Sequence, residues 1–562
     1  MPQADSDRTT GAGSAAIVHD EKTGGSMQGN GGITCGIRSS AVAALVALAF
    51  LLSGCGTPGV HRSGSNVTID SQPKAGQGAV LVETINVRPP GVLNAKWTEL
   101  VIESKRTGAP ITLSDLAGLG STASVFYAHL DEGDYEITQV LGLAGSPPGL
   151  LMAALMTDSQ QIRSRLGTFR VSARETSNLG VLVFAPPVGK EGKVWGIQSV
   201  QGPMGRQTAL ADLQRITGQS LTLAMGPGWV QPRPDAAESA DVARARSWAS
   251  QLSKAEQADA KSVIGGTVLG QVLERDSTGL WRSQPLDNLA TLTYVRRTDD
   301  GRLIAGADFG FYFVMDRAKS WIRHQVPNRD MAVTHVEPLP GNGAIIVACD
   351  LRRTIVYHNP DLANANAEPR KLLELEASFW FWNPALSTEA FLVLPVNHAG
   401  IRRTSDFHII DKKTLNVSVQ KQDFWIYQWQ KFPSGETLIS RQNGMSYYMS
   451  STPDSGKTWV HGETEGPPKF YFVDRQTGYG IDITRGAFSV TNQLVKTVDG
   501  GKTWKPMGSP STFDIGGEVL WVSPRGEVLI RAGWEVLSTA DEGKTWKQEL
   551  PVSSNHADPR QP

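Results

Sequence analysis

Three near copies of one eight-residue segment constrain this chain more than any other feature of its sequence. Each copy runs from a threonine to a tryptophan with an aspartate at its third position, and the copies begin at Thr452, Thr497 and Thr539. The copies are about 40 to 45 residues apart, which is the length of one four-stranded blade of a β-propeller. The C-terminal part of the chain is therefore predicted to be a propeller of repeated sheets.

The shared residues suit a turn between two strands. The aspartate can accept N–H bonds across the turn, the glycine can take a positive φ, and the tryptophan can pack on the sheet. The pattern resembles the Asp-box, or bacterial neuraminidase repeat, of sialidases, sortilin-type receptors and photosystem II assembly factors. In those families the box stabilises a peripheral loop, so the resemblance implies a structural role for Thr452, Asp454, Gly456, Thr458, Trp459, Thr497, Asp499, Gly501, Thr503, Trp504, Thr539, Asp541, Gly543, Thr545 and Trp546.

Weaker copies extend the period toward the N-terminus. The segments before Trp281 and Trp321 keep an aspartate and the tryptophan, and turn-forming segments occupy the next two expected places. The seven expected positions are Trp281, Trp321, Asp361, Lys412, Trp459, Trp504 and Trp546. We expect seven blades within residues 265–550, with six as the fallback.

Short β-branched and aromatic runs fill residues 79–202, between Gly, Pro and Asp turns. This pattern predicts a β-sandwich. The run Leu130–Ile137 resembles the "leucine, x, x, glycine, x, tyrosine" turn of transthyretin-like sandwiches, and the resemblance places Phe169, Val171, Leu179, Leu182 and Phe184 in the core. The expected strands are Ala79–Val87, Trp97–Glu103, Ser124–Ala128, Tyr135–Leu141, Gly167–Ala173, Gly180–Phe184 and Lys193–Gln198.

The two predicted all-β domains are joined by residues 203–264. Apolar residues at helical spacing predict a helix over Asp235–Val263, so this segment is expected to be a short helical linker. The apolar run Leu150–Met156 is expected to be a short helix, either buried or docked on a membrane or partner. Residues 551–562 are expected to be a disordered tail.

An export signal precedes these domains. The apolar run Ala41–Leu52 follows Arg38 and is too short to span a bilayer, which is typical of a signal peptide within residues 1–54. Residues 1–26 are polar and acidic, whereas a conventional signal begins at Met27, so we expect translation to start there.

The end of this run carries a lipidation motif. Leu52-Ser53-Gly54-Cys55 resembles the lipobox of bacterial lipoproteins, which implies a diacylglycerol and a palmitate-like acyl chain on Cys55. The alternative is an ordinary signal peptide with an incidental cysteine. Residues 55–78 are expected to be a flexible tether, and Gly56 favours the outer over the inner membrane of the bacterial cell envelope.

Charge and cysteine content exclude two other classes. The net charge is −1, so the chain lacks the basic footprint of a nucleic-acid-binding protein. Apart from Cys35 and Cys55 in the export region, only Cys349 remains, which excludes an internal disulfide framework. Cys349 follows an apolar run and is expected in the core.

The sequence shows no constellation typical of catalysis. Sialidases carry a "phenylalanine or tyrosine, arginine, isoleucine, proline" motif that is missing here. Scattered side chains could still line an axial pocket, or they could be solvated arginines and tyrosines packed between blades: Arg302, Arg323, Arg441, Arg485, Tyr294, Tyr448 and Tyr479. We predict no catalytic set, metal site or cofactor.

Two aromatic runs are candidates for binding. Successive strand residues point to opposite faces, so one face cannot hide all these rings. They either face a channel mouth or partner, or pack between blades; the residues are Trp380, Trp382, Trp425, Tyr427 and Trp429. The prediction is a membrane-tethered, non-catalytic binding or assembly lipoprotein with an envelope protein or glycan partner, and the alternative is a diverged, sialidase-like glycoside hydrolase.

Overall fold

The computed structural model describes residues 61–62 and 73–550, except for 88–93, 118–122, 146–152, 157–158, 186–195, 219–220, 222, 249–251, 253, 260–261, 299, 330, 351–352, 377–384, 399–403, 433, 444–445, 455–457, 486–489, 509–516 and 533–534. The signal region, Cys55, Trp380, Trp382, Gly456 and the tail at 551–562 lie outside the described residues. The segment from Gly59 onward belongs to one compact unit. None of the helices seen in the described ranges is long and apolar enough to cross a bilayer.

The N-terminal region forms two sheets. The larger has the order β1-β4-β3-β6-β8-β12, with β7 paired to β6. Its strands are β1 (His61–Arg62), β3 (Asn94–Ser104), β4 (Pro110–Ser114), β6 (Gly133–Gly145), β7 (Ala153–Met156), β8 (Thr168–Val171) and β12 (Gly228–Trp229). The smaller has the order β10-β9-β2-β5, with β11 paired to β9, and consists of β2 (Gln77–Asn86), β5 (Ala123–Asp131), β9 (Glu175–Ala185), β10 (Gly196–Val200) and β11 (Ala224–Met225).

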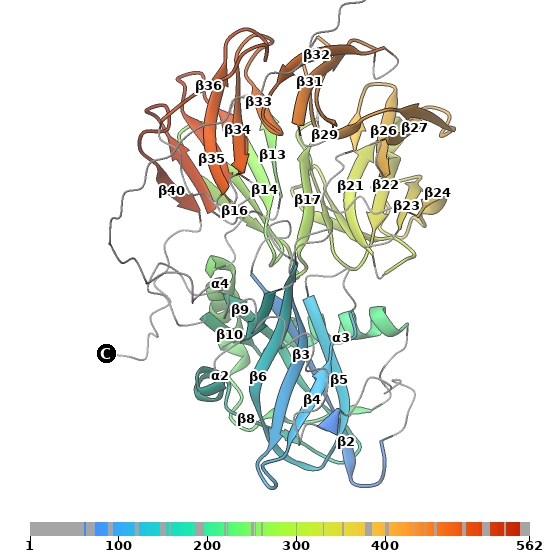
Figure 1. Cartoon of the computed structure of the whole chain (residues 1–562). Coiled ribbons are helices and arrows are strands. Elements are labelled where there is room, and N and C mark those ends of the chain that lie inside the picture. Colours follow the sequence, from blue (N-terminus) through green and yellow to red (C-terminus); the bar gives the residue numbers. More distant parts are fainter. Residues whose placement is uncertain are drawn as a thin grey trace, which may run out of the picture. The chain divides into compact units, whose positions relative to one another are not determined.

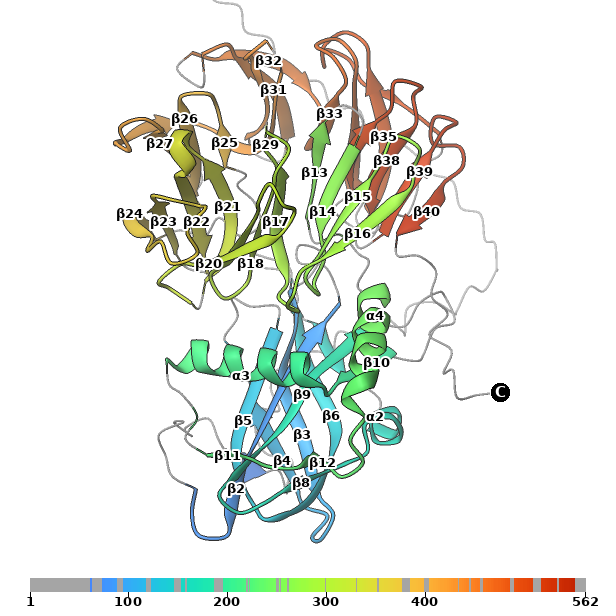
Figure 2. The ribbon, with the colours of Figure 1, turned by 180° about the vertical axis from the view of Figure 1, so that it is seen from behind.

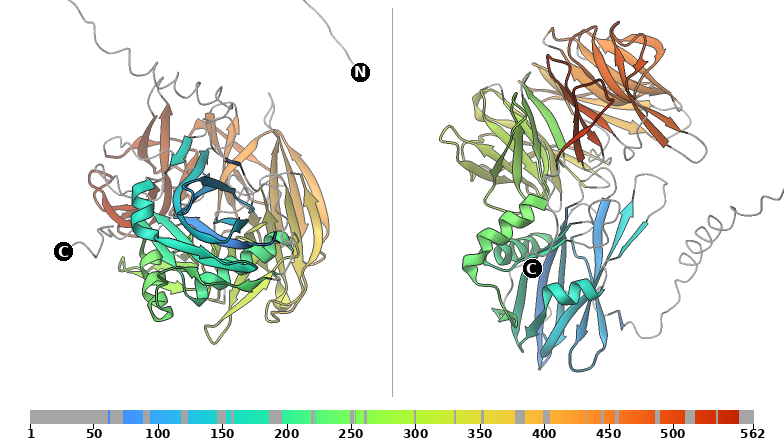
Figure 3. Two further views of the ribbon diagram at one scale, coloured as in Figure 1. Left: turned by 90° about the horizontal axis from the view of Figure 1, so that it is seen from below. Right: turned by 90° about the vertical axis from the view of Figure 1, so that its left-hand side faces the viewer.

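The two sheets share a core of aromatic and aliphatic side chains. Each expected strand overlaps an observed one, and the five side chains expected in the core are fully buried: Phe169, Val171, Leu179, Leu182 and Phe184. Seen end-on, the strands curve around this core (Figure 3, left). Strand β2 is buried on both faces: Val80 and Val82 enter the core, while Ala79 and Leu81 face the other side. A central strand covered on both faces reads as a near-continuous apolar run.

A helix covers that other side of the smaller sheet. Helix α3 (Pro203–Thr217) begins with proline at its first turn and ends at Gly218, whose φ of 71° and N–H bond to Gln214 O close the last turn. Figure 2 shows α3 crossing this sheet, and its Ala209 and Leu213 pack with Leu81 of β2. The other helical elements among the described residues are α2 (Ser159–Leu166), α4 (Glu238–Trp248) and the 3-10 turns η1 (Asp235–Ala237) and η2 (Pro340–Asn342).

The C-terminal region is a β-propeller. Its described part holds seven antiparallel sheets, each made of four consecutive strands (Figure 1). The first three are β13 (Lys254–Asp259), β14 (Ser262–Gly266), β15 (Gln271–Arg275) and β16 (Trp281–Pro285); β17 (Leu292–Arg297), β18 (Leu303–Ala307), β19 (Phe311–Met315) and β20 (Trp321–Gln325); and β21 (Ala332–Pro338), β22 (Ala344–Cys349), β23 (Thr354–Asn359) and β24 (Arg370–Leu375).

The other four sheets repeat this arrangement. They are β25 (Leu386–Ser387), β26 (Phe391–His398), β27 (Thr404–Asp411) and β28 (Val417–Gln422); β29 (Trp425–Lys431), β30 (Thr437–Asn443), β31 (Ser446–Thr452) and β32 (Val460–Glu465); β33 (Lys469–Phe472), β34 (Gly478–Arg485), β35 (Val490–Thr497) and β36 (Lys505–Pro506); and β37 (Glu518–Val522), β38 (Val528–Ala532), β39 (Glu535–Thr539) and β40 (Lys547–Leu550). Each of the seven sequence landmarks, from Trp281 to Trp546, lies where the third strand of one sheet passes into its fourth.

The fifth and sixth sheets are held together by polar contacts between their first strands. Gln430 of β29 makes two hydrogen bonds of 2.7 Å with the backbone N–H and C=O of Phe472 on β33. Gln428 binds Phe470 in the same way, at 2.9 Å and 2.8 Å. A side-chain amide carries one donor and one acceptor group, so it can satisfy both backbone groups of a residue in the next sheet.

The first and seventh sheets meet through side chains. Arg275 of β15 is 3% exposed and binds Glu549 of β40 through Nε at 2.6 Å and Nη2 at 2.8 Å. The same guanidinium binds Glu527 at 2.8 Å, and the Trp281 indole N–H donates to Glu549 at 2.9 Å. An apolar cluster containing Val263, Leu273 and residues of β37–β40 surrounds these contacts.

Several expected boundaries were wrong. The expected linker at 203–264 contributes β11 and β12 to the N-terminal sheets, and its last part forms β13 and β14. Lys254–Asp259 resembles a helix in composition, but it pairs with β14, and tertiary pairing overrides propensity. The expected helix at 150–156 contains strand β7, paired with β6, and the expected tether contributes β1, which pairs with β4.

Candidate functional site

The end of the fifth propeller sheet carries a cluster of half-buried rings. Trp425 on β29 lies opposite Gln442 on β30, and Gln442 lies opposite Tyr447 on β31. The ring of Tyr427 meets that of Tyr447 edge-on, with centroids 5.1 Å apart. We call Trp425, Tyr427, Gln442 and Tyr447 the aromatic cluster.

A β-bulge positions this cluster. Ile426 pairs with Arg441 and Gln428 with Ser440, which leaves Tyr427 as an extra residue on β29. A bulge bends a strand and redirects a side chain, and here it brings Tyr427 to Tyr447. Similar register shifts occur in the first strands of four other sheets, for example at Thr293 of β17.

Hydrogen bonds hold three members of the cluster. The Trp425 indole N–H donates to His398 O at 3.0 Å, and the Gln442 amide donates to the Tyr447 hydroxyl at 3.4 Å. Farther along β30 and β31, Leu438, Met449 and Ser450 are buried.

Trp429 does not belong to this cluster. It packs, partly buried, against Leu386, Phe407 and Ile439 between the fourth and fifth sheets. Of the five aromatic residues proposed from the sequence for binding, the structure brings together Trp425 and Tyr427 and packs the partly buried Trp429 against a core cluster; Trp380 and Trp382 lie outside the described residues. Tyr447 and Gln442 were not selected from the sequence, because only the strand register shows that they lie beside Trp425.

The three box segments share one hydrogen-bond pattern. In the second, Asp499 Oδ1 accepts the Thr503 N–H at 2.9 Å and the Thr497 hydroxyl at 2.7 Å, while Oδ2 accepts the Thr503 hydroxyl at 2.6 Å. Asp454 and Asp541 make the same three contacts, at 2.7 to 2.9 Å and 2.6 to 2.9 Å. The hydrogen bond from the Thr545 hydroxyl is the first of the contacts that lower the pKa of Asp541 to about 2.

The remaining box residues shape the turn and pack it on the sheet. Gly501 and Gly543 have φ values of 87° and 83°, which glycine adopts without strain. Trp504 meets Phe472 edge-on at 5.9 Å, and Trp459 meets Phe424 at 5.4 Å. These contacts close each turn and pack it against its own sheet.

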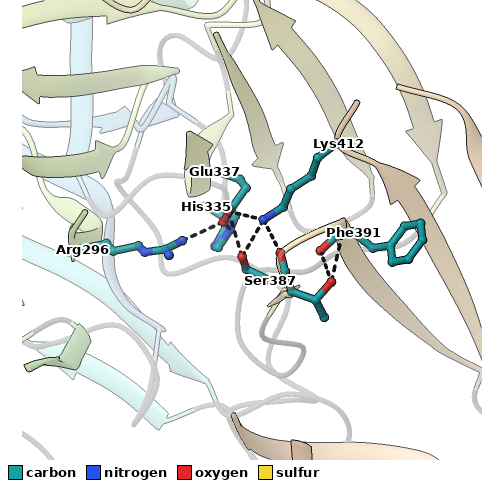
Figure 4. A network of polar contacts seen from close by, with 7 residues as sticks. Arg296, His335, Glu337, Ser387, Phe391 and Lys412 are labelled. Carbon is teal, nitrogen blue, oxygen red and sulfur yellow. Dashed lines mark hydrogen bonds and ion pairs between the residues drawn. The ribbon is translucent and has the colours of Figure 1, made fainter. Parts of the chain in front are cut away.

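A second polar cluster surrounds Glu337 and joins three sheets (Figure 4). Glu337 on β21 is 3% exposed and accepts bonds from Arg296 of β17 at 2.7 Å and from Lys412, after β27, at 2.6 Å. Ser387 of β25 donates to it at 2.8 Å, and His335 Nε2 lies 3.3 Å away. Burial alone would raise the pKa of Glu337, but the hydrogen bond and charge of His335, with Arg296 and Lys412, outweigh it and hold the pKa well below its usual range.

Ser387 and Lys412 lie as close together as a nucleophile and a general base. Their Oγ and Nζ atoms are 3.0 Å apart. However, Lys412 donates to Glu337, to Ser387 and to Thr388 O at 2.5 Å, which uses all three ammonium hydrogens. Ser387 in turn donates to Glu337, so this cluster acts as an ionic clamp between sheets.

The arginines considered from the sequence do not converge on one pocket. Arg302 precedes β18 and pairs with Asp300 at 2.7 Å, while Arg323 lies on the outer strand β20. Arg441 lies on β30 over the Tyr448 ring at 5.0 Å. The side chain of Arg485 lies outside the described set. Tyr294 is buried against His335, and Tyr479 is buried with Lys496 over its ring.

Comparison with known proteins gives fold likenesses only. No protein-family model and no curated protein sequence matches the chain. Solved structures similar to about half of it include YCF48 bound to D1 peptide, at 12% identity over 52% of this chain and 93% of that one, with a TM-score of 0.35. Virginiamycin B lyase from Staphylococcus aureus is 11% identical over 51% and 96%, with a TM-score of 0.34. The β-propeller domain of the trilobed protease from Pyrococcus furiosus is 13% identical over 55% and 99%, with a TM-score of 0.35.

Proposed function

We propose that the protein is a lipid-anchored, non-catalytic binding or assembly lipoprotein of the bacterial cell envelope. In this proposal Cys55 carries the lipid, and the N-terminal sheets form a transthyretin-like sandwich. The seven four-stranded sheets form seven blades of one propeller, which presents its aromatic cluster to a protein partner.

The aromatic cluster is the observation that carries the binding role. Tryptophan and tyrosine are the side chains most enriched where binding energy concentrates, because each contributes a large rigid area and a polar group. Trp425, Tyr427 and Tyr447 are half-buried and already held by neighbours, which lowers the entropy cost of binding. Gln442 adds a polar group between the rings, as a specific interface requires.

The seven-blade arrangement is supported by the contact between the ends of the series. Arg275 of the first sheet and Glu549 of the seventh form a bidentate ion pair, and β13 contacts β37. Bidentate arginine–carboxylate pairs fix geometry as well as adding energy.

The binding role can be tested in intact cells with the full chain. A photo-crosslinking amino acid replaces Tyr427, and a control chain carries it at Val498, which is 63% exposed and lies outside the cluster. A single crosslinked protein species is expected at Tyr427 alone, and Trp425→Ala should abolish it. Once that species is identified and purified, Trp425→Ala should weaken its binding by about tenfold or more.

Two outcomes would contradict the proposal. Equal crosslinking at Tyr427 and Val498 would remove the aromatic cluster from the interface. A crosslinked species degraded by glycosidases and resistant to proteases would replace the protein partner with a glycan.

The anchor has a separate test. Fatty-acid labelling of the full chain is expected to be lost in Cys55→Ser and kept in Cys35→Ser. Labelling that survives Cys55→Ser would refute the anchor and leave the binding role untouched.

A further inference from the structure

Three buried carboxyl side chains from different segments gather around Arg215 of α3. They are Glu83 of β2, Asp212 of α3 and Asp308 of the turn between β18 and β19, with exposed fractions of 1%, 2% and 1%. This carboxyl cluster lies inside the compact unit that begins at Gly59. None of its members takes part in the aromatic cluster or in the contacts of Glu337.

One arginine faces these three acids at close range. Arg215 forms an ion pair with Asp212, and the two side chains are 11% and 3% exposed. Its guanidinium also lies over the Phe311 ring at 4.0 Å and the Phe309 ring at 5.4 Å. Arg323 is the other cation near this place, but its side chain is exposed and acts on Arg215 by repulsion. If all three acids were ionised, the cluster would carry excess negative charge in an environment that solvates it poorly.

The side chains of Glu83 and Asp212 interact directly. They are hydrogen-bonded to each other, and two buried carboxyl groups in such contact cannot both be ionised. Burial is the largest cause that raises the pKa of Glu83 well above its usual range, and repulsion from Asp212 adds to it. Burial also raises the pKa of Asp212 to about 6, although Arg215 opposes the rise. The protonated carboxyl of Glu83 therefore donates to Asp212, which pairs with Arg215.

The turn that brings Asp308 to this place is itself constrained. Phe309, the next residue, has a φ of 58°, which bulky L-residues rarely adopt, and it is 4% exposed. Such a conformation persists only where the surroundings fix it. Here Phe309 and Phe311 lie in one apolar cluster with Ile85 of β2, against which Ile216 of α3 also packs. The carboxyl cluster is thus enclosed by apolar contacts among β2, α3 and this turn.

We propose that this carboxyl cluster is a proton-dependent latch, which joins β2, α3 and the β18–β19 turn most tightly at mildly acidic pH and loosens as the pH rises. Opening the latch lets water reach Glu83 and Asp212, so that both can ionise. The element that moves is α3 together with the turn, since their contacts close the cluster.

The sign of the effect follows from proton linkage. Both acids have a higher pKa in the folded protein than in the unfolded chain, so the folded state binds more protons. The stabilisation is complete below the unfolded carboxyl pKa of about 4. It is lost as the pH rises from there to the folded values, so the loss from Asp212 is complete near pH 6 and the loss from Glu83, whose pKa is raised well above its usual range, continues above that.

Hydrogen exchange on the full chain tests the latch. Opening of α3 and of residues 303–315 is compared at about pH 6 and about pH 8.5, after correction for intrinsic exchange rates. In the wild type the opening constant should rise by up to about tenfold per pH unit for each proton released. In Glu83→Gln, whose neutral amide keeps a donor toward Asp212, most of this rise should disappear.

Two further variants make the test decisive. Asp241→Asn is the matched control, because Asp241 of α4 is also buried and faces an arginine, Arg233, outside the carboxyl cluster; the pH response of α3 should stay as in the wild type. If Glu83→Gln does not fold, Asp308→Asn takes its place. It removes a repelling charge from the β18–β19 turn and should reduce the rise of the opening constant with pH. A slope unchanged by these cluster substitutions, or an α3 whose opening does not respond to pH, would overturn the latch.

Discussion

Asp499 and Thr503 are joined twice, because one carboxylate oxygen accepts the threonine N–H at 2.9 Å and the other accepts its hydroxyl at 2.6 Å. The same double contact joins Asp541 to Thr545 at 2.9 Å and 2.6 Å. Each pair closes the turn between the third and fourth strands of its sheet. An ionised carboxylate accepts at both oxygens, so these turns depend on the charge of the aspartate.

Replacement of Asp541 by asparagine should destabilise the seventh sheet at neutral pH. The amide nitrogen cannot accept the hydroxyl of Thr545, and a charge-assisted bond is lost. Chemical denaturation should show a lower midpoint than in the wild type. Glu542→Gln changes an exposed acid in the same turn and should leave the midpoint unchanged.

The same pair predicts a response to acid. The pKa of Asp541 is lowered to about 2 in the folded protein, so its stabilisation is present above the unfolded carboxyl pKa and is lost as the pH falls through the folded value. The difference in midpoint between Asp541→Asn and the wild type should therefore shrink steadily below about pH 4. A difference that stays constant down to about pH 2 would show that the charge contributes nothing.

Removing the side-chain amide of Gln430 should weaken the contact between the fifth and sixth sheets. Gln430→Ala leaves the N–H and C=O of Phe472 without their partner, and each unpaired buried group costs about 1–3 kcal/mol. Urea unfolding at neutral pH measures this loss. Lys431→Ala, at an exposed position on the same strand, should change the free energy of unfolding little, and equal losses in both variants would contradict the assigned role.

Glu337→Gln should strongly destabilise the protein. The substitution removes the anion that Arg296 and Lys412 share, and breaking a buried ionic cluster on one side costs about 3–5 kcal/mol. The free energy of unfolding should fall by this amount. Glu389→Gln changes an exposed acid in the turn after β25 and should have no measurable effect. A smaller loss in Glu337→Gln/Lys412→Met than in the single variant would show that the uncompensated cation causes most of the cost.

Arg275→Met should loosen the contact between the first and seventh sheets. The change leaves Glu549 with the hydroxyl of Ser538 and the indole N–H of Trp281 as donors. Hydrogen exchange should increase in β13–β16 and β37–β40 and stay unchanged in β25–β28, the middle sheet of the series. Exchange that is unchanged from the wild type in every sheet would mean that apolar packing alone holds the first and seventh sheets together.

The sequence was most informative where one residue type serves one local purpose. The aspartates and tryptophans of the box segments mark the turns between third and fourth strands, and alternating apolar residues mark the N-terminal strands. The aromatic cluster could be predicted only in part, because the proximity of Tyr447 to Trp425 depends on the register of three strands and on the bulge at Tyr427. The carboxyl cluster gave no signal, since Glu83, Asp212 and Asp308 are far apart in the chain and only tertiary packing brings them together.

Composition misled the prediction where tertiary pairing decided the outcome. Lys254–Asp259 contains residues common in helices, yet it is the first strand of the first propeller sheet. Ala153–Met156 likewise pairs with β6 rather than forming a helical turn. Both segments are short, so hydrogen bonds to a neighbouring strand outweigh their intrinsic preference.

Each described propeller sheet takes its four strands from one continuous stretch of chain, and the ends of the series meet through Arg275 and Glu549. A gene segment encoding one such stretch could therefore be duplicated, deleted or moved without dividing any sheet between distant parts of the polypeptide. By the same logic, joining the natural ends of the series and cutting it between two other sheets would give a circularly permuted chain with every sheet intact. This modular organisation keeps each described sheet intact when the order of the stretches in the chain changes.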